Sequence, residues 1–224
     1  MTQDRRGPET ASALAFFGSM TASMSHDLNN VVAIIHQVNG LLADLCVGME
    51  AGRTPAPDRL KSVQERIDRQ VARGGALIKR LNRFAHSVDD PHVTFDLKAL
   101  AEEFGALCGR RCERHNMALA IESPEAPLNI TSAPFLLLMM LSSALDRYLV
   151  DAEEGDRVQL SLVPDGDGVR LDFEGRSGSP APSQWIAEFD SLSRALDGRW
   201  TEDEQQSALT LSIMLPVSGM DTRS

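Results

Sequence analysis

Basic residues are under-represented in this chain of 224 residues: Lys and Arg total 22 against 32 Asp and Glu, a formal net charge of −10 at pH 7. Binding to nucleic acid without sequence preference depends on basic patches that neutralise phosphates. The charge balance therefore argues against a nucleic-acid partner. We expect a soluble cytoplasmic protein that meets another protein through a local surface patch.

Cysteine is also scarce. The three cysteines, Cys46, Cys108 and Cys112, include no CxxC pair. Disulfide frameworks and structural zinc sites both need paired ligands at regular spacing. We therefore expect free thiols, with neither a disulfide nor a resident metal ion.

Long hydrophobic runs are missing as well. The longest begins at Pro134 and reads PFLLLMMLSSALDRYLV, which is too short and too polar at its end to span a bilayer. The first eight residues are polar and charged, unlike a signal peptide. We therefore expect no membrane association.

What the chain does contain, first of all, is a pair of long helical patterns. No proline lies between Glu9 and Glu50, and apolar or small residues recur there at alternating steps of three and four, the pattern of a heptad seam. AGRTPAPD, residues 51–58, predicts a turn, and a second seam runs from about Asp58 to Val88. The seam residues are Leu14, Phe17, Thr21, Met24, Leu28, Val31, Ile35, Val38, Leu42 and Leu45, then Leu60, Val63, Ile67, Val71, Gly74, Ile78, Leu81, Ala85 and Val88.

A hairpin with such narrow apolar stripes usually dimerises into a four-helix bundle. Packing of the stripes on the second half of the same chain is the alternative. We assign residues 9–88 to a helical hairpin domain.

The remainder, residues 93–218, alternates between helical and strand patterns. Asp96 is a candidate N-cap for the first helix of this half, and two alternating runs around PDGDG predict a β-hairpin. The mixture predicts an α+β sandwich, with helices packed on one sheet. Expected helices cover 95–117, 132–153 and 183–198, and expected strands cover 118–123, 127–131, the two arms of 157–175, and 207–216.

Polar residues interrupt the apolar pattern of the first expected helix in the segment SMSHDLNNVVAII, residues 23–35. His26 lies two residues from both Met24 and Leu28, so at about 100° per residue it points away from the seam. Asn30 follows one turn later on nearly the same bearing, and Asp27 is adjacent. An exposed neutral imidazole is a good nucleophile for phosphorus; a carboxylate can take its proton, and a carboxamide can hold a water or a phosphoryl oxygen. A surface histidine without a role is the alternative.

The segment HDLNN, which starts at His26, matches the H-[E/D]-x-x-[N/T] phosphoacceptor motif, and the chain resembles the sensor histidine kinase family. There the motif lies on the first helix of a dimerisation and phosphotransfer hairpin. The resemblance implies that His26 is phosphorylated, that Asp27 is its acid/base partner, and that Asn30 positions a water or a phosphoryl group. One departure is Val31, where many relatives have proline.

The second half resembles the ATP-binding domain of these kinases in the order of its elements, but its functional boxes are not retained. The two asparagines of the nucleotide- and magnesium-binding helix would fall at Met139 and Ser143, and methionine is no ligand for magnesium. EGRSG stands where the family has D-x-G-x-G, with Glu174 for the Asp and Arg176 for the first Gly. Too few residues follow Gly178 for a glycine-rich lid. The resemblance thus implies a retained scaffold without ATP binding, similar in plan to the dimeric ChpT-type histidine phosphotransferases.

The leading hypothesis is a phosphorelay histidine phosphotransferase. His26 would exchange a phosphoryl group with response-regulator receiver domains without ATP, and the receiver would supply Mg²⁺. A non-catalytic adaptor that binds a receiver or a kinase is a second hypothesis, and a divergent histidine kinase or phosphatase is a third.

The resemblance also suggests a surface for the receiver. Ala22, Ala33 and Gln37 share the face of His26, and their small or neutral side chains leave room for another protein. The second helix is basic along its solvent side, with Arg73 and Arg80 as the candidates for contact with the acidic pocket of a receiver. A merely solvated helix face is the alternative.

Overall fold

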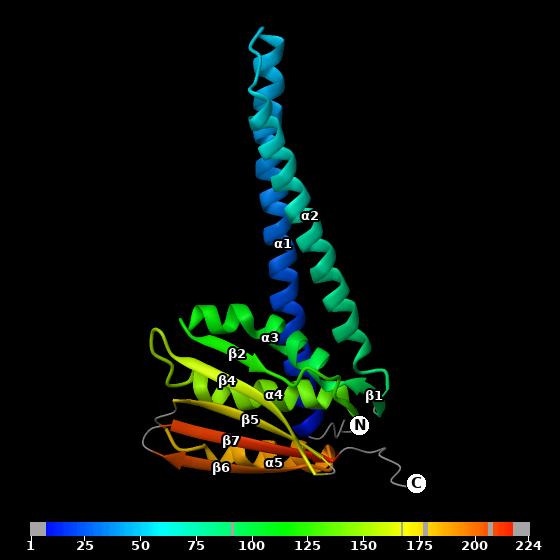
Figure 1. Ribbon diagram of the computed structural model, residues 1–224, viewed down its shortest axis with the longest axis vertical. Helices are drawn as coiled ribbons and strands as arrows, with labels where there is room; N and C mark the ends of the chain where they lie inside the picture. The colour runs from blue at the N-terminus through cyan, green and yellow to red at the C-terminus, as the bar shows by residue number, and fades with distance from the viewer. Residues whose placement is uncertain (1–7, 91, 167, 177–178, 206–207, 217–224) are drawn as a thin grey trace, which may run out of the picture. The chain divides into compact units, whose positions relative to one another are not determined.

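The computed structural model describes residues 8–90, 92–166, 168–176, 179–205 and 208–216. Residues 14–85 form one compact unit, the helical unit. The described residues from 86 onward, together with residues 8–13, form the other, the sandwich unit. The predicted end of the second domain, residue 218, lies outside the described residues. The elements run in the order α1 (Pro8–Glu50), α2 (Pro57–His86), β1 (Val93–Asp96), α3 (Leu97–Arg114), β2 (Ala118–Glu122), β3 (Asn129–Ser132), α4 (Pro134–Leu149), β4 (Arg157–Asp165), β5 (Gly168–Arg176), α5 (Ser183–Ala195), β6 (Arg199–Gln205) and β7 (Ala208–Pro216) (Figure 1).

The helical unit is an antiparallel hairpin of α1 and α2. Gly52, with φ of +79°, follows the end of α1 in the left-handed region that favours glycine. Pro57 then opens α2, where its fixed φ suits the first helical position. The predicted turn between the two helices is confirmed.

Apolar contacts join the two helices along their length. At one end Phe84 stacks on Phe17, with ring centroids 5.3 Å apart, and meets Phe16 edge to face at 5.8 Å. In the middle Gly74 faces Val31, and a Cβ added at this glycine would lie 3.3 Å from Val31 Cγ1. Toward the tip a cluster of apolar side chains fills the space between the helices: Ile34, Val38, Leu42, Leu45, Val63 and Ile67.

The predicted seams are buried only in part. Leu14, Leu60, Val71, Ile78 and Val88 are exposed, whereas Leu77 and Phe84, outside the predicted seam of α2, are buried. The physical reason is that each helix of a two-helix hairpin has only one neighbour, so apolar side chains on the flank away from that neighbour stay uncovered. The hairpin therefore presents large apolar side chains on its surface.

The sandwich unit contains a five-stranded sheet in the order β2-β4-β5-β7-β6 and a two-stranded sheet of β1 and β3. β2 pairs with β4 in parallel, and the other neighbours are antiparallel. β4 and β5 form the predicted hairpin. Side chains alternate along them, so that Val158, Leu160 and Leu162 are buried between more exposed neighbours.

The helices α3, α4 and α5 pack on one face of the large sheet. Phe173 of β5 contacts Phe104 of α3 and Tyr148 of α4, with ring centroids 6.3 Å away in both cases. On β6, Trp200 contacts Phe189 of α5 at 5.1 Å. Leu171, Ile213 and Trp200 are direct cross-strand partners, so the packed face continues from β5 to β6. The predicted α+β sandwich is confirmed.

A capping residue in the local sequence determines where α3, the first helix of the sandwich unit, begins. Asp96 is its N-cap, and the carboxylate accepts a hydrogen bond from the backbone N–H of Lys98 at 3.0 Å. The same carboxylate accepts from the N–H of Leu128 at 3.1 Å and so holds the approach to β3. The predicted cap is confirmed. The strands β1 and β6 were not expected from the sequence.

Candidate functional site

His26 lies on the exposed side of α1, in the part of that helix that belongs to the helical unit. A step of two residues from the buried Met24 turns about 200° around the helix, and His26 is accordingly exposed. The predicted exposure of the imidazole is confirmed. The buried side chains of α1 in this unit recur mostly at steps of seven: Met20, Met24, Val31, Val38 and Leu45.

Asn30 lies one turn beyond His26 and contacts its ring. Asn30 Nδ2 is 3.2 Å from His26 Nδ1. Residues four apart share a helix face, so the helix itself brings these two groups together. The direction of this hydrogen bond depends on the tautomer of the imidazole ring.

The other predicted residues of this face lie as expected. Ala22, one turn before His26, is exposed, as are Ala33 and Gln37. Asp27 is half-buried and lies about 100° around the helix from His26. The imidazole is thus bordered by a methyl group on one side and a carboxamide on the other, which leaves space for a large reactant.

Arg73 and Arg80 lie on α2 at the height of this site. Gly74 of α2 faces Val31 of α1. Because the hairpin is antiparallel, moving five residues back along α1, from Val31 to His26, corresponds to moving five residues forward along α2 from Gly74. At 1.5 Å per residue this is a shift of about 7.5 Å, which brings Lys79 level with His26, places Arg80 one residue further along, and leaves Arg73 beside Val31. Arg73 is exposed and Arg80 is half-buried.

The resemblance assigns nucleotide and magnesium binding to α4, and Trp185 of α5 contacts this helix at Ser143. Met139 is buried. The carbonyl oxygen of Ser143 accepts a hydrogen bond from the indole N–H of Trp185 at 3.1 Å. Trp185 in turn stacks on Phe189, with ring centroids 4.5 Å apart. The bulky side chains of α5 therefore lie against α4.

Arg147 extends this packing by one helical turn. It is only 5% exposed, its guanidinium carbon lies 5.6 Å from the centroid of the Trp185 ring, and its Nη2 donates to Glu202 at 2.7 Å. Trp200 contacts Trp185 edge to face at 5.6 Å and donates its indole N–H to Asp190 at 2.7 Å. This cluster was not predicted from the sequence. A signal was present, because both tryptophans of the chain lie within this short C-terminal stretch.

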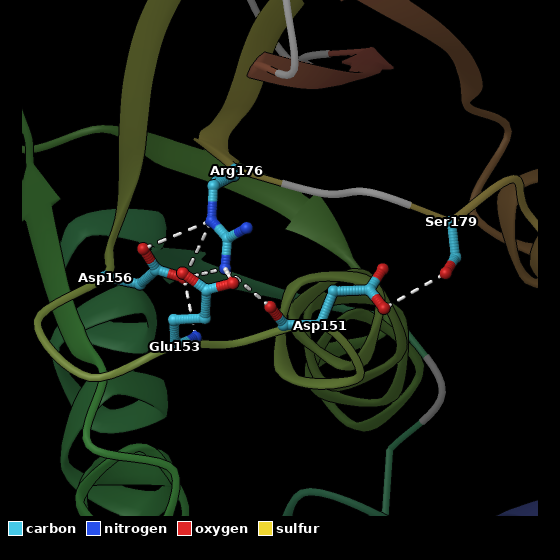
Figure 2. Close-up of polar contacts among 5 residues, drawn as sticks. All are labelled: Asp151, Glu153, Asp156, Arg176 and Ser179. Carbon is cyan, nitrogen blue, oxygen red and sulfur yellow. Dashed lines mark hydrogen bonds and ion pairs between the residues drawn. The ribbon is translucent and has the colours of Figure 1, made fainter.

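Arg176, the residue in the place of the family's first loop glycine, is held by the segment between α4 and β4 (Figure 2). Its Nη2 is 3.0 Å from Asp156 Oδ2, 3.1 Å from Glu153 Oε1 and 2.9 Å from the carbonyl oxygen of Asp151. The hydrogen bond from Arg176 lowers the pKa of Asp156 below its ordinary value. Beyond the strand, Ser179 donates to Asp151 Oδ1 at 3.0 Å. A side chain with ion-pair partners thus stands where the family has a bare backbone.

Glu174, the predicted counterpart of the adenine-binding Asp, lies on the other face of the sheet. It is exposed and still belongs to β5, next to Phe173, whose ring packs on Tyr148 of α4. Side chains alternate along a strand, so the carboxylate of Glu174 points away from the face that carries α4. Ser177 and Gly178 of the predicted loop lie outside the described residues.

Two further expectations concern metals and thiols. Cys46 is exposed, and Cys108 and Cys112 are buried; all three thiols are free. Burial raises the pKa of Cys108 to about 12. Among the residues that the structure describes, no group of three His, Cys, Asp or Glu side chains could hold a metal ion.

Within the part of the chain that the structure describes, one helix has the length and composition of a membrane span. Residues 11–50 of α1 contain a window with a mean hydropathy of 1.6, of which 11% is buried. A single helix of this kind near the N-terminus is weak support for a membrane span, so the cytoplasmic location stays a prediction.

No family model matches the chain. No curated protein sequence matches it significantly either.

Solved structures, in contrast, match over most of its length. A histidine kinase from Burkholderia phymatum is 14% identical, with a TM-score of 0.53 over 97% of this chain and 100% of that one. The histidine kinase AdeS of Acinetobacter baumannii is 16% identical, with a TM-score of 0.50 over 87% of this chain and 98% of that one. The nucleotide-free catalytic domain of the histidine kinase ThkA is 12% identical, with a TM-score of 0.50 over 56% of this chain and 95% of that one. At these identities the likeness shows the fold: a helical hairpin followed by an α/β domain of the histidine kinase type.

Proposed function

We propose that this protein is a histidine phosphotransferase of two-component signalling, which accepts a phosphoryl group on His26 from a receiver domain and returns it to a receiver domain. The observation that carries the proposal is the exposed His26 on a hairpin helix, with the carboxamide of Asn30 3.2 Å from its Nδ1. The histidine-kinase fold supports it, since the motif HDLNN lies on the first helix of that fold.

The main contribution of the protein to this reaction is to position His26 against the phosphorus atom. A ring nitrogen of neutral His26 attacks the phosphorus of an aspartyl phosphate, an N–P bond forms, and the O–P bond breaks. The receiver's aspartate leaves as a carboxylate, and the phosphoimidazole keeps its second ring proton as a cation until a base removes it. Asp27, the adjacent residue, is the candidate base. Most of the rate gain comes from holding the two reactants in line.

Three features of the sandwich unit support transfer without ATP. Met139 and Ser143 provide no carboxamide for a nucleotide-bound metal, and Trp185 covers the backbone of α4 at Ser143. Arg176 is bound to Asp156 where the family loop has glycine. An exposed receiver pocket would bring its own Mg²⁺, so the transferase itself needs no metal.

The hairpin offers a surface to which a receiver can dock. Ala22, Ala33 and Gln37 are exposed around His26 and leave it accessible. Arg80 adds positive charge on α2 near the height of His26, and Arg73 adds it beside Val31. Such charge suits the acidic pocket that holds the metal ion in a receiver, because opposite charges steer association.

We also propose a homodimer built through the hairpin. Large apolar side chains stay exposed on α2 in a single chain, including Val71 and Ile78, which are seven residues apart and so share a face. A second hairpin would cover them and complete a four-helix bundle.

The test is a pair of labelling assays with wild type, His26→Ala and His36→Ala. His36 is also exposed on α1, so it is the matched control for the loss of a surface imidazole. One assay offers labelled ATP alone, and the other offers a pre-phosphorylated receiver domain with Mg²⁺. We expect label from the receiver on wild type and on His36→Ala, and none on His26→Ala.

Each other outcome contradicts the proposal in its own way. Label from ATP would identify a kinase. A receiver that loses its phosphate while the protein stays unlabelled would identify a phosphatase. A phosphorylated receiver that binds the protein but keeps its phosphate would identify a non-catalytic adaptor.

A further inference from the structure

Four arginines of α2 repeat at steps of seven residues. Residues seven apart on a helix lie within about 20° of each other, so the four side chains form one line along α2. This line, the arginine row, consists of Arg59, Arg66, Arg73 and Arg80. At 1.5 Å per residue it is about 32 Å long, close to the diameter of a small domain. Arg59 and Arg73 are exposed, and Arg66 and Arg80 are half-buried.

The hairpin does not neutralise the arginine row. Between residues 11 and 49, α1 has only two acids for the four guanidinium groups, Asp27 and Asp44. The acids of α2 are Asp58, Glu65 and Asp68. They lie about 100° or more around the helix from the row. Within residues 8–90, which the structure describes without a gap, none of the four guanidinium groups forms an ion pair, and the buried Nε of Arg80 has no hydrogen-bond partner. The row is therefore a line of positive charge, available to an acidic partner, in a chain of net charge −10.

The row borders the contact between the two helices on the side to which His26 opens. Counted from the buried Leu77, Arg80 lies three residues on, a rotation equivalent to about −60°. Counted from the buried Val31 of α1, His26 lies five residues back, a rotation equivalent to about −140°. In an antiparallel pair, rotations of the same sense away from the contact lead to the same side of the hairpin. A body that covers the row can therefore also reach the imidazole.

The other flank of α2 is apolar. Val71 and Ile78 are exposed there, and Ile78 is two residues from Arg80, which is about 160° around the helix. A second chain that covers Val71 and Ile78, as in the proposed dimer, would approach α2 from this flank. It would leave the arginine row open to another partner.

Along the hairpin, the row begins near the height of His26 and runs toward the tip. Lys79 is level with His26, so Arg59, twenty residues earlier on α2, lies about 30 Å closer to the tip. A small domain such as a receiver is about as wide as this distance. With its aspartyl phosphate at His26, it can contact the row along the rest of its width.

We propose that the arginine row determines which receiver domains the hairpin accepts, namely those that present a line of carboxylates to α2. Opposite charges across an interface raise the association rate, and missing or like charges reject wrong partners. Arginine suits this task because its planar guanidinium can bind a carboxylate through two hydrogen bonds. The identity of the partner rests on the proposed function, but binding through the row can be measured without phosphotransfer.

The experiment measures binding of receiver domains to the full chain with His26→Ala, by isothermal titration calorimetry, so that no transfer occurs. The test variant adds Arg59→Gln and Arg66→Gln, two members of the row far from His26. The matched control adds Lys61→Gln and Lys79→Gln instead. Both lysines are exposed on α2 and lie about 100° or more around the helix from the row, so the control loses the same charge at another place. The probes are purified receiver domains with an acidic surface helix and receiver domains without one.

We expect the arginine pair of substitutions to weaken the binding of acidic receivers about fivefold at low salt, since two exposed ion pairs are lost. The lysine control should change it by less than about twofold, and high salt should reduce the difference. Receivers without an acidic helix should bind more weakly and not distinguish the two variants. Equal affinities of the two variants for the acidic receivers would overturn the inference, as would a failure of acidic receivers to bind. A DNA duplex that binds as tightly as they do, and depends on the row, would also overturn it.

The two proposals fail separately. If acidic receivers bind through the row but wild type takes no label from them, the phosphotransfer proposal fails and the row stands as the docking surface of an adaptor. If His26 is labelled equally well by acidic receivers and by the others, only the role of the row is refuted.

Discussion

Trp185 donates its indole N–H to the backbone carbonyl oxygen of Ser143 at 3.1 Å, and this bond fastens α5 to the middle of α4. Ser143 is the position at which the family resemblance places a nucleotide-binding asparagine. The stack of Trp185 on Phe189 and the buried guanidinium of Arg147 beneath its ring continue the contact. This packing of side chains covers the part of α4 to which the family resemblance assigns nucleotide binding.

The first prediction concerns this packing. Trp185→Ala should lower the free energy of unfolding by about 2 kcal/mol, since a half-buried aromatic side chain loses its contacts. The variant should still not bind nucleotide, because Met139 and Ser143 cannot hold a nucleotide-bound metal. Urea unfolding and thermal unfolding with and without Mg-ATP measure the two effects.

Ile186→Ala is the matched control, because Ile186 is an exposed apolar residue on the same helix. Its stability should stay within about 0.5 kcal/mol of wild type. A rise in the melting temperature of wild type with Mg-ATP would contradict the prediction.

The fold was largely predictable because its patterns are local. Heptad periodicity predicted α1 and α2, and alternation around PDGDG predicted the hairpin of β4 and β5. The strand β6 was missed because its sequence, RWTEDEQ, is acidic and Trp200 is its only apolar residue. It is an edge strand that exists through its pairing with β7, and a pairing partner is not visible in the strand's own sequence.

In the candidate site, too, the features that depend on one helix were predictable from the sequence, and those that depend on distant segments were not. Helix geometry alone predicted that His26 is exposed and that Asn30 lies on its face, since both follow from positions on one helix. The partners of Trp185 and Arg176 were not predictable, because they depend on segments that only the folded sheet brings together. The sheet face on which Glu174 lies was not predicted either, since one residue along a strand reverses the face.

The second prediction concerns the ion pair of Arg176 and Asp156. Asp156 has a lowered pKa because Arg176 donates to it, so the pair contributes stability above the ordinary aspartate pKa of about 3.9. That contribution is lost as the pH falls through the lower pKa of the folded protein. Arg176→Met should therefore be less stable than wild type at neutral pH, and the difference should shrink in strong acid, where only the bond to the backbone carbonyl of Asp151 remains. Urea unfolding across this pH range measures it.

Arg157→Met is the control for the loss of an arginine, because Arg157 is exposed and directly follows Asp156. Its difference from wild type should vary little with pH. High salt should reduce the effect of Arg176→Met, because both members of the pair are within reach of solvent. A difference between Arg176→Met and wild type that persists unchanged in acid would show that the guanidinium acts through packing instead.

The third prediction concerns the thiols. Cys108 has its pKa raised to about 12 by burial, so at pH 8 roughly one molecule in ten thousand carries the reactive thiolate there. Burial also raises the pKa of Cys112. Iodoacetamide should therefore label the exposed Cys46 of the folded protein first, and the other two only after unfolding. Peptide mass spectrometry of timed samples gives the order, and early label on Cys108 would contradict the assigned burial.

The last prediction concerns the exposed apolar face of α2. If a second chain covers Val71 and Ile78, the double variant Val71→Glu/Ile78→Glu should be monomeric under conditions where wild type is a dimer, because buried unpaired carboxylates are costly. The variant should keep its helix content, since both side chains are exposed within one chain. Sedimentation equilibrium and circular dichroism measure the two properties.

Val150→Glu, at an exposed apolar residue of the sandwich unit, is the control and should stay dimeric. A wild type that is monomeric at high concentration would refute the dimer itself. A double variant that stays dimeric would place the interface on another face of the hairpin.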